Sequence, residues 1–179
     1  MCDPRIVENP HPIKIITYRE LRELSSMGAT VLHEESIFPV KLAGIPINIR
    51  NTNRPSDIGT MIVTSTDKYR TDDIITGIAG KKGFSVIRIE KDMMNQETGF
   101  GMKVLKVFSD LGVSFEHLPS GIDTMCVIIN RDDISGRERE ILSSISRAVN
   151  PDNIDYEPSL ALIAVVGRNM AGMPGPAAR

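Results

Sequence analysis

Residues 84–130 read FSVIRIEKDMMNQETGFGMKVLKVFSDLGVSFEHLPSGIDTMCVIIN, and this stretch decides the fold. It begins with an apolar run typical of a β-strand, Phe84–Ile89, and continues into Gly99–Leu111, where apolar residues recur every three or four positions as in a helix. Two further runs, Val113–Leu118 and Thr124–Asn130, have the composition of strands. The stretch therefore predicts the order strand, helix, strand, strand.

The same kind of pattern continues on the C-terminal side. Ser135 is followed three residues later by Glu138, the spacing of a capping box, and this predicts the start of a second helix. After a turn at residues 150–153, the apolar run Leu160–Val166 predicts a final strand. The complete order β-α-β-β-α-β is that of a ferredoxin-like α+β domain, with both helices on one face of the sheet.

The N-terminal third shows a different arrangement of elements. Thr17 and Glu20 have capping-box spacing, and Gly28 stands where a C-terminal glycine would end the helix. Further along, residues 31–43 form an apolar-patterned segment that is bent or broken near Pro39, and residues 45–49 and 59–63 predict two short strands. Because the run 65–73 is almost wholly polar, we predict a domain boundary near residue 70.

Composition excludes several classes of protein. The 179 residues are 41% hydrophobic, enough for a folded core, and 21 basic side chains against 23 acidic ones give a net charge of −2. This balance gives no electrostatic reason to expect nucleic acid or an anionic membrane as a partner. No apolar stretch approaches the roughly 20 residues of a membrane-spanning helix, and no secretory signal is recognisable, so we predict a cytoplasmic protein.

The residues that commonly bind metals or carry out nucleophilic catalysis form no recognisable set. Cys2 and Cys126 cannot make a disulfide framework, and the three histidines share no metal-ligand spacing. Asp132 and Asp133 have the character of a solvated turn, and no nucleophile with an adjacent base stands out. We predict no metal site and no complete catalytic site.

A glycine-rich basic segment at residues 75–83, ITGIAGKKG, raises the question of a phosphate-binding loop. The spacing of its glycines differs from that of the P-loop, and a strand rather than a helix follows it. We interpret this segment as a turn that carries solvated lysines before the strand.

A second loop, residues 92–101, joins a predicted strand to the N-terminus of a predicted helix. Free N–H groups at such a terminus can bind a carboxylate, and its glycines allow a ligand to approach the backbone. Glu116 and Asp123 are placed to bind an ammonium group across the same edge of the sheet. These features suggest a site for a zwitterion such as an amino acid, although ordinary turn chemistry also explains them.

The chain resembles aspartate kinases in many stretches that occur in the family's order. On the N-terminal side these stretches are DPRIV at 3–7, ITYREL at 16–21, MGATVLH at 27–33 and GIPINI at 44–49. Farther along they are ITGIA at 75–79, GVS at 112–114, LPSG at 118–121 and LALIAVVG at 160–167. The resemblance covers essentially the whole chain.

The resemblance implies an α/β organisation in three parts. Residues 1–70 would be the C-terminal piece of an amino-acid-kinase domain with its linker, 71–153 a first ferredoxin-like ACT domain, and 154–179 the start of a second. The family phosphorylates the side-chain carboxylate of aspartate with ATP and Mg, in the biosynthesis of lysine, threonine and methionine. Because the family's Lys-Phe-Gly-Gly motif does not occur in this sequence, we expect the chain alone to be inactive and to bind no cofactor tightly.

Individual positions take their expected roles from the resemblance. Nucleotide contacts map to Arg5, Thr30 and Val31, and the arginine suits bidentate phosphate binding. The allosteric effector, which we expect to be lysine, maps to Met93, Asn95, Gly99, Phe100, Gly101, Glu116, Ser120 and Asp123. The family also implies a homodimer formed through ACT domains.

Two other functions compete with this interpretation. One is a non-catalytic amino-acid-sensing ACT protein that acts as a regulatory subunit, but residues 1–57 resemble kinase sequence that such a sensor would not need. The other is an RNA-binding ferredoxin-like domain, which needs stacking aromatic residues on its sheet. Aromatics make up only 4% of this chain, and we therefore favour the kinase.

Overall fold

The computed structural model describes residues 7–8, 10–28, 32, 34–69, 74–168 and 170, with the backbone alone for residues 34–36. The chain divides into two compact units. The first unit contains residues 1–81 and 162–179, and the second contains residues 82–161.

The first unit contains a small mixed sheet and two helices. Strands β1 (Ile15–Thr17) and β3 (Thr60–Val63) are parallel, and β2 (Ile47–Ile49) pairs antiparallel with the other edge of β3. Helix α1 (Tyr18–Ser26) follows β1 without a break, and α2 (Glu34–Leu42) contains Pro39. The sheet and α1 share a core that includes Ile16, Tyr18, Leu21, Leu24, Ile62, Ala79 and Val166.

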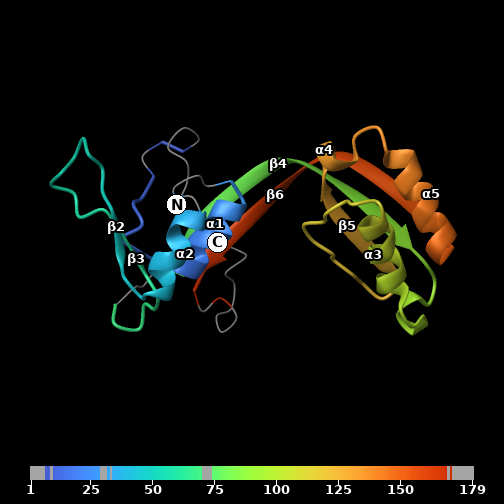
Figure 1. The fold of residues 1–179 in the computed structure, drawn as a ribbon, viewed down its shortest axis with the longest axis horizontal. Helices are drawn as coiled ribbons and strands as arrows, with labels where there is room; N and C mark the ends of the chain where they lie inside the picture. Colours follow the sequence, from blue (N-terminus) through green and yellow to red (C-terminus); the bar gives the residue numbers. More distant parts are fainter. Residues whose placement is uncertain are drawn as a thin grey trace. The chain divides into compact units, whose positions relative to one another are not determined.

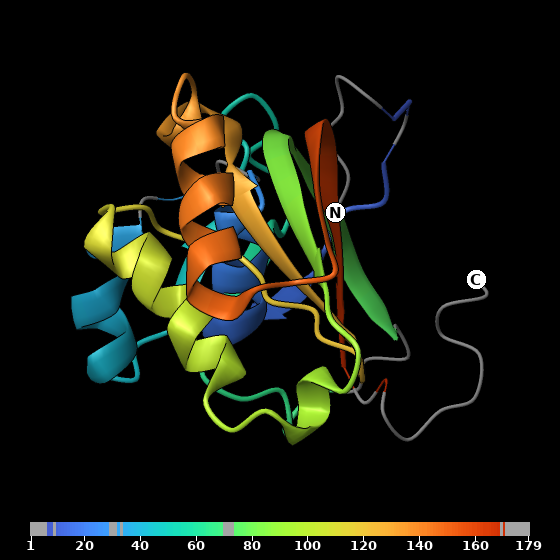
Figure 2. The same ribbon diagram turned by 90° about the vertical axis from the view of Figure 1, so that its right-hand side faces the viewer.

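The second unit is a sheet covered on one face by two helices. Strand β4 (Ile75–Glu90) pairs antiparallel with β5 (Thr124–Asn130), and two isolated bridges attach residues 117–120 to the far edge of β5. Helices α3 (Phe100–Asp110) and α5 (Glu138–Val149) pack side by side on this sheet (Figure 2). Their inner residues form the core with both strands; it includes Ile87, Ile89, Val104, Phe108, Val127, Ile129, Ile141 and Ile145.

Two long strands belong to both units. Strand β6 (Asn153–Gly167) runs beside β4, as Figure 1 shows, and the sheet order is β5-β4-β6. The Arg168 amide donates to the Ile74 carbonyl at one end of the pair, and the Asp152 amide donates to the Glu90 carbonyl at the other. The two strands are therefore antiparallel.

A buried carboxylate connects α1 to the ends of both long strands. Glu20 is 6% exposed, and its carboxylate accepts hydrogen bonds from the backbone and hydroxyl of Thr17, from the Thr76 hydroxyl and from Arg168 Nε at 2.8 Å. Arg168 also donates through Nη2 to the Ile15 carbonyl at 2.7 Å. We call Thr17, Glu20, Thr76 and Arg168 the Glu20 cluster. It holds the start of β4 and the residue after β6 against α1.

The structure confirms the α/β class and much of the predicted order. The capping box of Thr17 and Glu20 is present, α1 is followed by a turn at Gly28, and β5 has the predicted bounds. Helix α3 lies within the predicted range, where the apolar spacing marked the helix correctly. Helix α2 lies within the apolar-patterned segment 31–43, whose helical structure the sequence pattern had not assigned.

Two local predictions were wrong. Residues 75–83 are not a turn, because they continue β4, where Thr76, Gly77 and Ala79 are buried. Ser135 does not begin the second helix. Instead Asn130 caps a short helix α4 (Arg131–Ile134), Gly136 turns the chain at a φ of 79°, and α5 begins at Glu138 without a side-chain cap.

Two strand predictions also differ from the structure. Residues 113–118 form no continuous strand; His117 and Ser120 bridge singly to Ile128 and Met125. Strand β6 begins at Asn153 rather than Leu160, and it includes Pro158 and a left-handed Ser159 with a φ of 70°. Pairing with β4 maintains the extended backbone through residues that alone would predict an interruption.

Gly167 provides a test of the close approach of β6 to β4. A Cβ atom at this position would collide with the Ile74 carbonyl oxygen, whereas a Cβ at Gly80 would meet the Leu162 carbonyl oxygen at an ordinary 3.6 Å. We expect Gly167→Ala to lower the free energy of unfolding by about 1–3 kcal/mol, the usual cost of overpacking. Urea denaturation followed by circular dichroism measures this, with Gly80→Ala as the control. Equal stabilities of the two variants would contradict the packing at Gly167.

The Glu20 cluster predicts how stability changes with pH. Burial alone would raise the pKa of Glu20, but hydrogen bonds from Arg168, Thr17 and Thr76 outweigh burial and hold the pKa below its ordinary value of 4.5. The stabilisation from the charged form is therefore complete above about pH 4.5 and is lost as the pH falls through the folded-state pKa. We expect the stability difference between the wild type and Glu20→Gln to shrink on acidification below pH 4.5. Urea titrations at pH 7 and at low pH measure it; a difference that does not depend on pH would contradict the prediction.

Candidate functional site

The loop between β4 and α3, residues 91–99, has a backbone shape that ordinary helices and strands do not allow. Met93 and Gly99 both have left-handed conformations, with φ of 58° and 79°. Between them lies η1 (Met94–Gln96), a single 3-10 turn, whose Met94 is buried in the core of the second unit. Met93, in contrast, is 58% exposed. The loop is anchored by one methionine and presents the other to solvent.

Lys91 holds the base of this loop to its surroundings. Its ammonium group donates to Glu97 Oε2 at 2.6 Å and to the carbonyl of Val149 at 2.6 Å, and it lies 5.8 Å from the centre of the Phe100 ring. Val149 is the last residue of α5, and a cation near the C-terminus of a helix interacts favourably with the helix dipole. One side chain thus connects the loop, α3 and the end of α5.

Glu97 lies within the loop and binds two cations. In addition to Lys91, it accepts a hydrogen bond from Lys103 Nζ at 2.6 Å. The hydrogen bonds from Lys103 and Lys91 hold the pKa of Glu97 below its usual value. Glu97 therefore stays ionised at neutral pH and fixes the loop to the first turn of α3.

The N-terminus of α3 supplies donors for an anion. The Phe100 amide already donates to the Glu97 carbonyl, and the Lys103 amide donates to the Gly99 carbonyl. The N–H groups of the first turn that lie between them, those of Gly101 and Met102, have no carbonyl within the helix to pair with. Together with the helix dipole they favour a carboxylate at this point.

Asp123 and Ser120 lie at the same end of the sheet as the loop. The Lys91 amide donates to the Asp123 carbonyl at 3.0 Å, and Ser120 bridges to Met125, beside the last pair of the β4–β5 ladder. Both side chains are exposed. The structure thus pairs the backbone of Asp123 with Lys91, the first residue of the loop, and leaves the Asp123 side chain exposed.

Glu116 lies farther along the sheet. Its amide donates to the carbonyl of Ile128, which pairs with Val86, four residues before Glu90 at the loop end of β4. At about 3.3 Å per residue, four residues correspond to roughly 13 Å. Glu116 and the loop are therefore separated along the sheet, whereas the other predicted residues of the loop, Met93, Asn95, Gly99, Phe100 and Gly101, are contiguous.

Sequence reasoning missed the two residues that organise the loop. Lys91 and Glu97 are six positions apart, as are Glu97 and Lys103, and side chains at this separation contact each other neither in a helix nor in a strand. Lys91 also binds a carbonyl 58 positions away. No local sequence pattern predicts these ion pairs or the bond from Lys91 to Val149.

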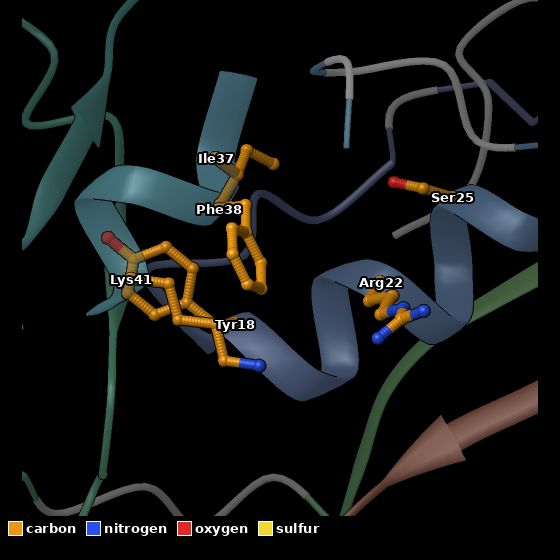
Figure 3. Close-up of a pocket in the computed structure, with 6 residues that line it drawn as sticks. All are labelled: Tyr18, Arg22, Ser25, Ile37, Phe38 and Lys41. Atoms are coloured by element: carbon orange, nitrogen blue, oxygen red, sulfur yellow. The ribbon is translucent and has the colours of Figure 1, made fainter. Parts of the chain in front are cut away.

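A small cavity lies elsewhere, between α1 and α2 in the first unit (Figure 3). Tyr18, Arg22 and Ser25 line it from α1, and Ile37, Phe38 and Lys41 from α2. Its volume of about 30 Å³ suits one or two water molecules and is too small for an amino acid. Ser25 Oγ is buried here with no hydrogen-bond partner in the described part of the chain.

Other site types have little support among the residues that the structure describes. Within that part of the chain, no three His, Cys, Asp or Glu side chains are grouped as metal ligands. No described helix has both the length and the apolar character needed to cross a membrane. Arg5, Thr30 and Val31, the expected nucleotide contacts, lie outside the described residues.

Comparison with known proteins shows which proteins the chain is similar to. The chain is 42% identical over 178 residues to aspartokinase 3 of Bacillus subtilis. It is homologous to aspartokinases over nearly its whole length. The match covers 99% of this chain and 39% of that aspartokinase, so the chain spans about two fifths of its relative. Residues 1–51 also match the amino acid kinase family.

Solved aspartokinases have the same fold. The crystal structure of the allosteric aspartate kinase of Clostridium acetobutylicum superposes with a TM-score of 0.86 and is 53% identical, covering 98% of this chain and 40% of that one. Aspartokinase III of Escherichia coli, 20% identical, shares the fold with a TM-score of 0.74 in its complex with aspartate and ADP. Its complex with lysine and aspartate gives 0.66; these two matches cover 98% and 94% of this chain, and 39% and 37% of that enzyme.

Lys91 provides a test of how the loop is held. We expect Lys91→Met to speed amide exchange across residues 93–99, because Glu97 and the end of α5 lose their shared cation. Hydrogen–deuterium exchange with mass spectrometry measures this directly. Lys106→Met is the control, since Lys106 pairs with Asp110 on the exposed face of α3. Unchanged exchange of the loop in Lys91→Met would show that the cation does not hold it.

Proposed function

We propose that this chain contains the allosteric region of an aspartate kinase and that residues 91–123 bind the amino-acid effector. The observation that supports the proposal is the hydrogen bond from the Lys91 amide to the Asp123 carbonyl, which joins an exposed acidic residue to the first residue of the loop. The same loop leads into α3, whose N-terminus offers N–H donors. A carboxylate and an ammonium group are the two charges of an amino acid. The homology to aspartokinases supports the same role.

We propose that the whole protein, of which this chain would form the regulatory part, catalyses the aspartate kinase reaction. The enzyme would transfer a phosphoryl group from ATP, with Mg, to the side-chain carboxylate of aspartate; the complex of the Escherichia coli homologue with aspartate and ADP supports this. In this chain Arg5, Thr30 and Val31 would contact the nucleotide. These few contacts do not provide the positioning on which phosphoryl transfer depends, so we propose that the chain alone is inactive.

Lysine is the effector that we propose. The Escherichia coli homologue was crystallised with lysine and aspartate in its T-state, and the geometry here fits the same class of ligand. The carboxylate would bind the N–H groups near Gly99–Gly101, and an ammonium group would bind Asp123. Glu116, predicted for the same role, would lie outside the site, because the register places it roughly 13 Å farther along the sheet. Met93, Asn95, Phe100 and Ser120 would line the same site.

The match of residues 1–51 to the amino acid kinase family favours this proposal over a separate regulatory subunit. We also propose that domain boundaries lie near residues 70 and 153 and that the protein is cytoplasmic.

We also propose that the chain forms a homodimer through its regulatory part. Strand β6 has a partner on one side only in the described sheet, and Ile163 and Val165 are 73% and 46% exposed. An edge strand with apolar side chains and unpaired backbone groups favours pairing with another strand. Size-exclusion chromatography with light scattering would detect the dimer.

Calorimetric titration of the chain with lysine tests the effector site. We expect saturable heat with lysine and none with threonine. Replacing Asp123 with alanine should weaken lysine binding by about tenfold or more, since a hydrogen bond to a charged group contributes roughly 1.5–3 kcal/mol.

Asp132→Ala is the matched control, because Asp132 is an exposed carboxylate on α4 outside the proposed site. It should bind lysine like the wild type. Equal affinity of Asp123→Ala and wild type would remove Asp123 from the site. Absence of heat with lysine, in a chain that circular dichroism shows to be folded, would contradict the effector assignment.

A further inference from the structure

The Glu20 cluster joins helix α1 to the two strands that continue into the second unit. Glu20 lies on the first turn of α1, Thr76 near the beginning of β4, and Arg168 directly after the end of β6. Both strands run from these contacts into residues 82–161, where the proposed effector loop begins at the end of β4. One carboxylate therefore binds the beginning of β4, which leads to the loop, and the residue that follows its neighbour β6.

We propose that Glu20 is a coupling residue, through which a change in β4 and β6 within the second unit reaches helix α1. The effector side of this proposal rests on the function proposed above. The coupling itself rests on the contacts of the cluster.

The contacts of Glu20 make it suited to this role. Both of its carboxylate oxygens are used: Oε2 accepts from the backbone and hydroxyl of Thr17, within its own segment, and Oε1 accepts from Thr76 and Arg168. The side chains of Glu20 and Arg168 are only 7% and 15% exposed. A shift of either strand would leave a buried charge without its partner, which is costly, so α1 is favoured to move with the strands.

Apolar packing between α1 and the strand pair is a second route for such a change, which the test must separate from the Glu20 cluster. A Cβ atom on Gly28, just after the helix, would lie 3.4 Å from the Gly80 carbonyl oxygen in β4. Ala79 and Val166, one from each strand, share the buried core with Leu21 and Leu24 of α1. The helix is thus in contact with the strand pair at both ends and along its apolar face.

The test measures how far a disturbance in the second unit reaches α1. Ile87 lies in β4 within the core of the second unit, and Ile87→Val is a small cavity-forming change there. Hydrogen–deuterium exchange of α1 is measured with and without Ile87→Val, in the wild-type, Glu20→Gln and Glu23→Gln backgrounds. Glu23 is the control, because it lies on the same helix but pairs with exposed Arg19.

We expect Ile87→Val to speed exchange of α1 by roughly threefold or more in the wild type and in Glu23→Gln, and by less than about 1.5-fold in Glu20→Gln, as coupling through one residue requires. A similar factor in all three backgrounds, or no effect on α1 in the wild type, would overturn the proposal. Thr76→Val provides a milder variant should Glu20→Gln fail to fold, since it removes only the bond to β4. It should give an intermediate factor, and a factor equal to that of the wild type would count against the coupling.

A parallel arm with lysine separates this proposal from the effector assignment. Lysine should slow exchange of the loop at residues 93–99 in every background, and slow exchange of α1 only where Glu20 is intact. Lysine that slows α1 equally in Glu20→Gln would overturn the coupling. Lysine that protects nothing, together with the expected Ile87→Val result, would overturn the effector assignment and support the coupling.

Discussion

The buried ion pair between Glu20 and Arg168 is the constraint on which the first unit depends. A carboxylate that leaves water must be compensated, and here four hydrogen bonds from Thr17, Thr76 and Arg168 provide the compensation. These bonds fix the positions of three chain segments at once: the end of β1, the start of β4 and the end of β6. The apolar side chains of α1 pack with Ala79 and Val166 in the same unit as this polar cluster.

A second carboxylate, Glu97, organises the second unit in a different way. It binds Lys91 and Lys103 near the surface, where solvent and salt weaken each ion pair, so its contribution lies in the shape of a loop more than in overall stability. The left-handed conformation of Met93 costs conformational energy, whereas Gly99 adopts it without steric penalty, and the bridged loop between them is where a ligand-binding site is expected to form. The two carboxylates thus lie at the two ends of β4, one at its helix contact and the other at its loop.

The sequence predicted helices and strands best where a local signal coincided with the final contact. The capping box at Thr17 is one case, and the bounds of β5 are another, because alternation and burial agree there. Prediction from the sequence failed where a segment far away in the chain determined the local conformation. Residues 75–83 contain three glycines and two lysines, typical of a turn, yet pairing with β6 keeps them extended. At Ser135 the local capping pattern was overruled by Asn130, which began a shorter helix four residues earlier.

The sequence by itself determined the resemblance to aspartokinases, the α/β class and the order of most elements, and it predicted the loop of the candidate effector site. Each of these depends on motifs or spacings within a few residues. Only the tertiary structure decided that Glu20, which caps its own helix three residues away, also binds Thr76 and Arg168, which lie 56 and 148 positions along the chain. It likewise decided that Lys91 joins the loop to the end of α5. The physical reason is that a hydrogen bond within one turn leaves a repeated spacing in the sequence, whereas a pairing of buried charges across the fold depends on where the packed strands place the two groups.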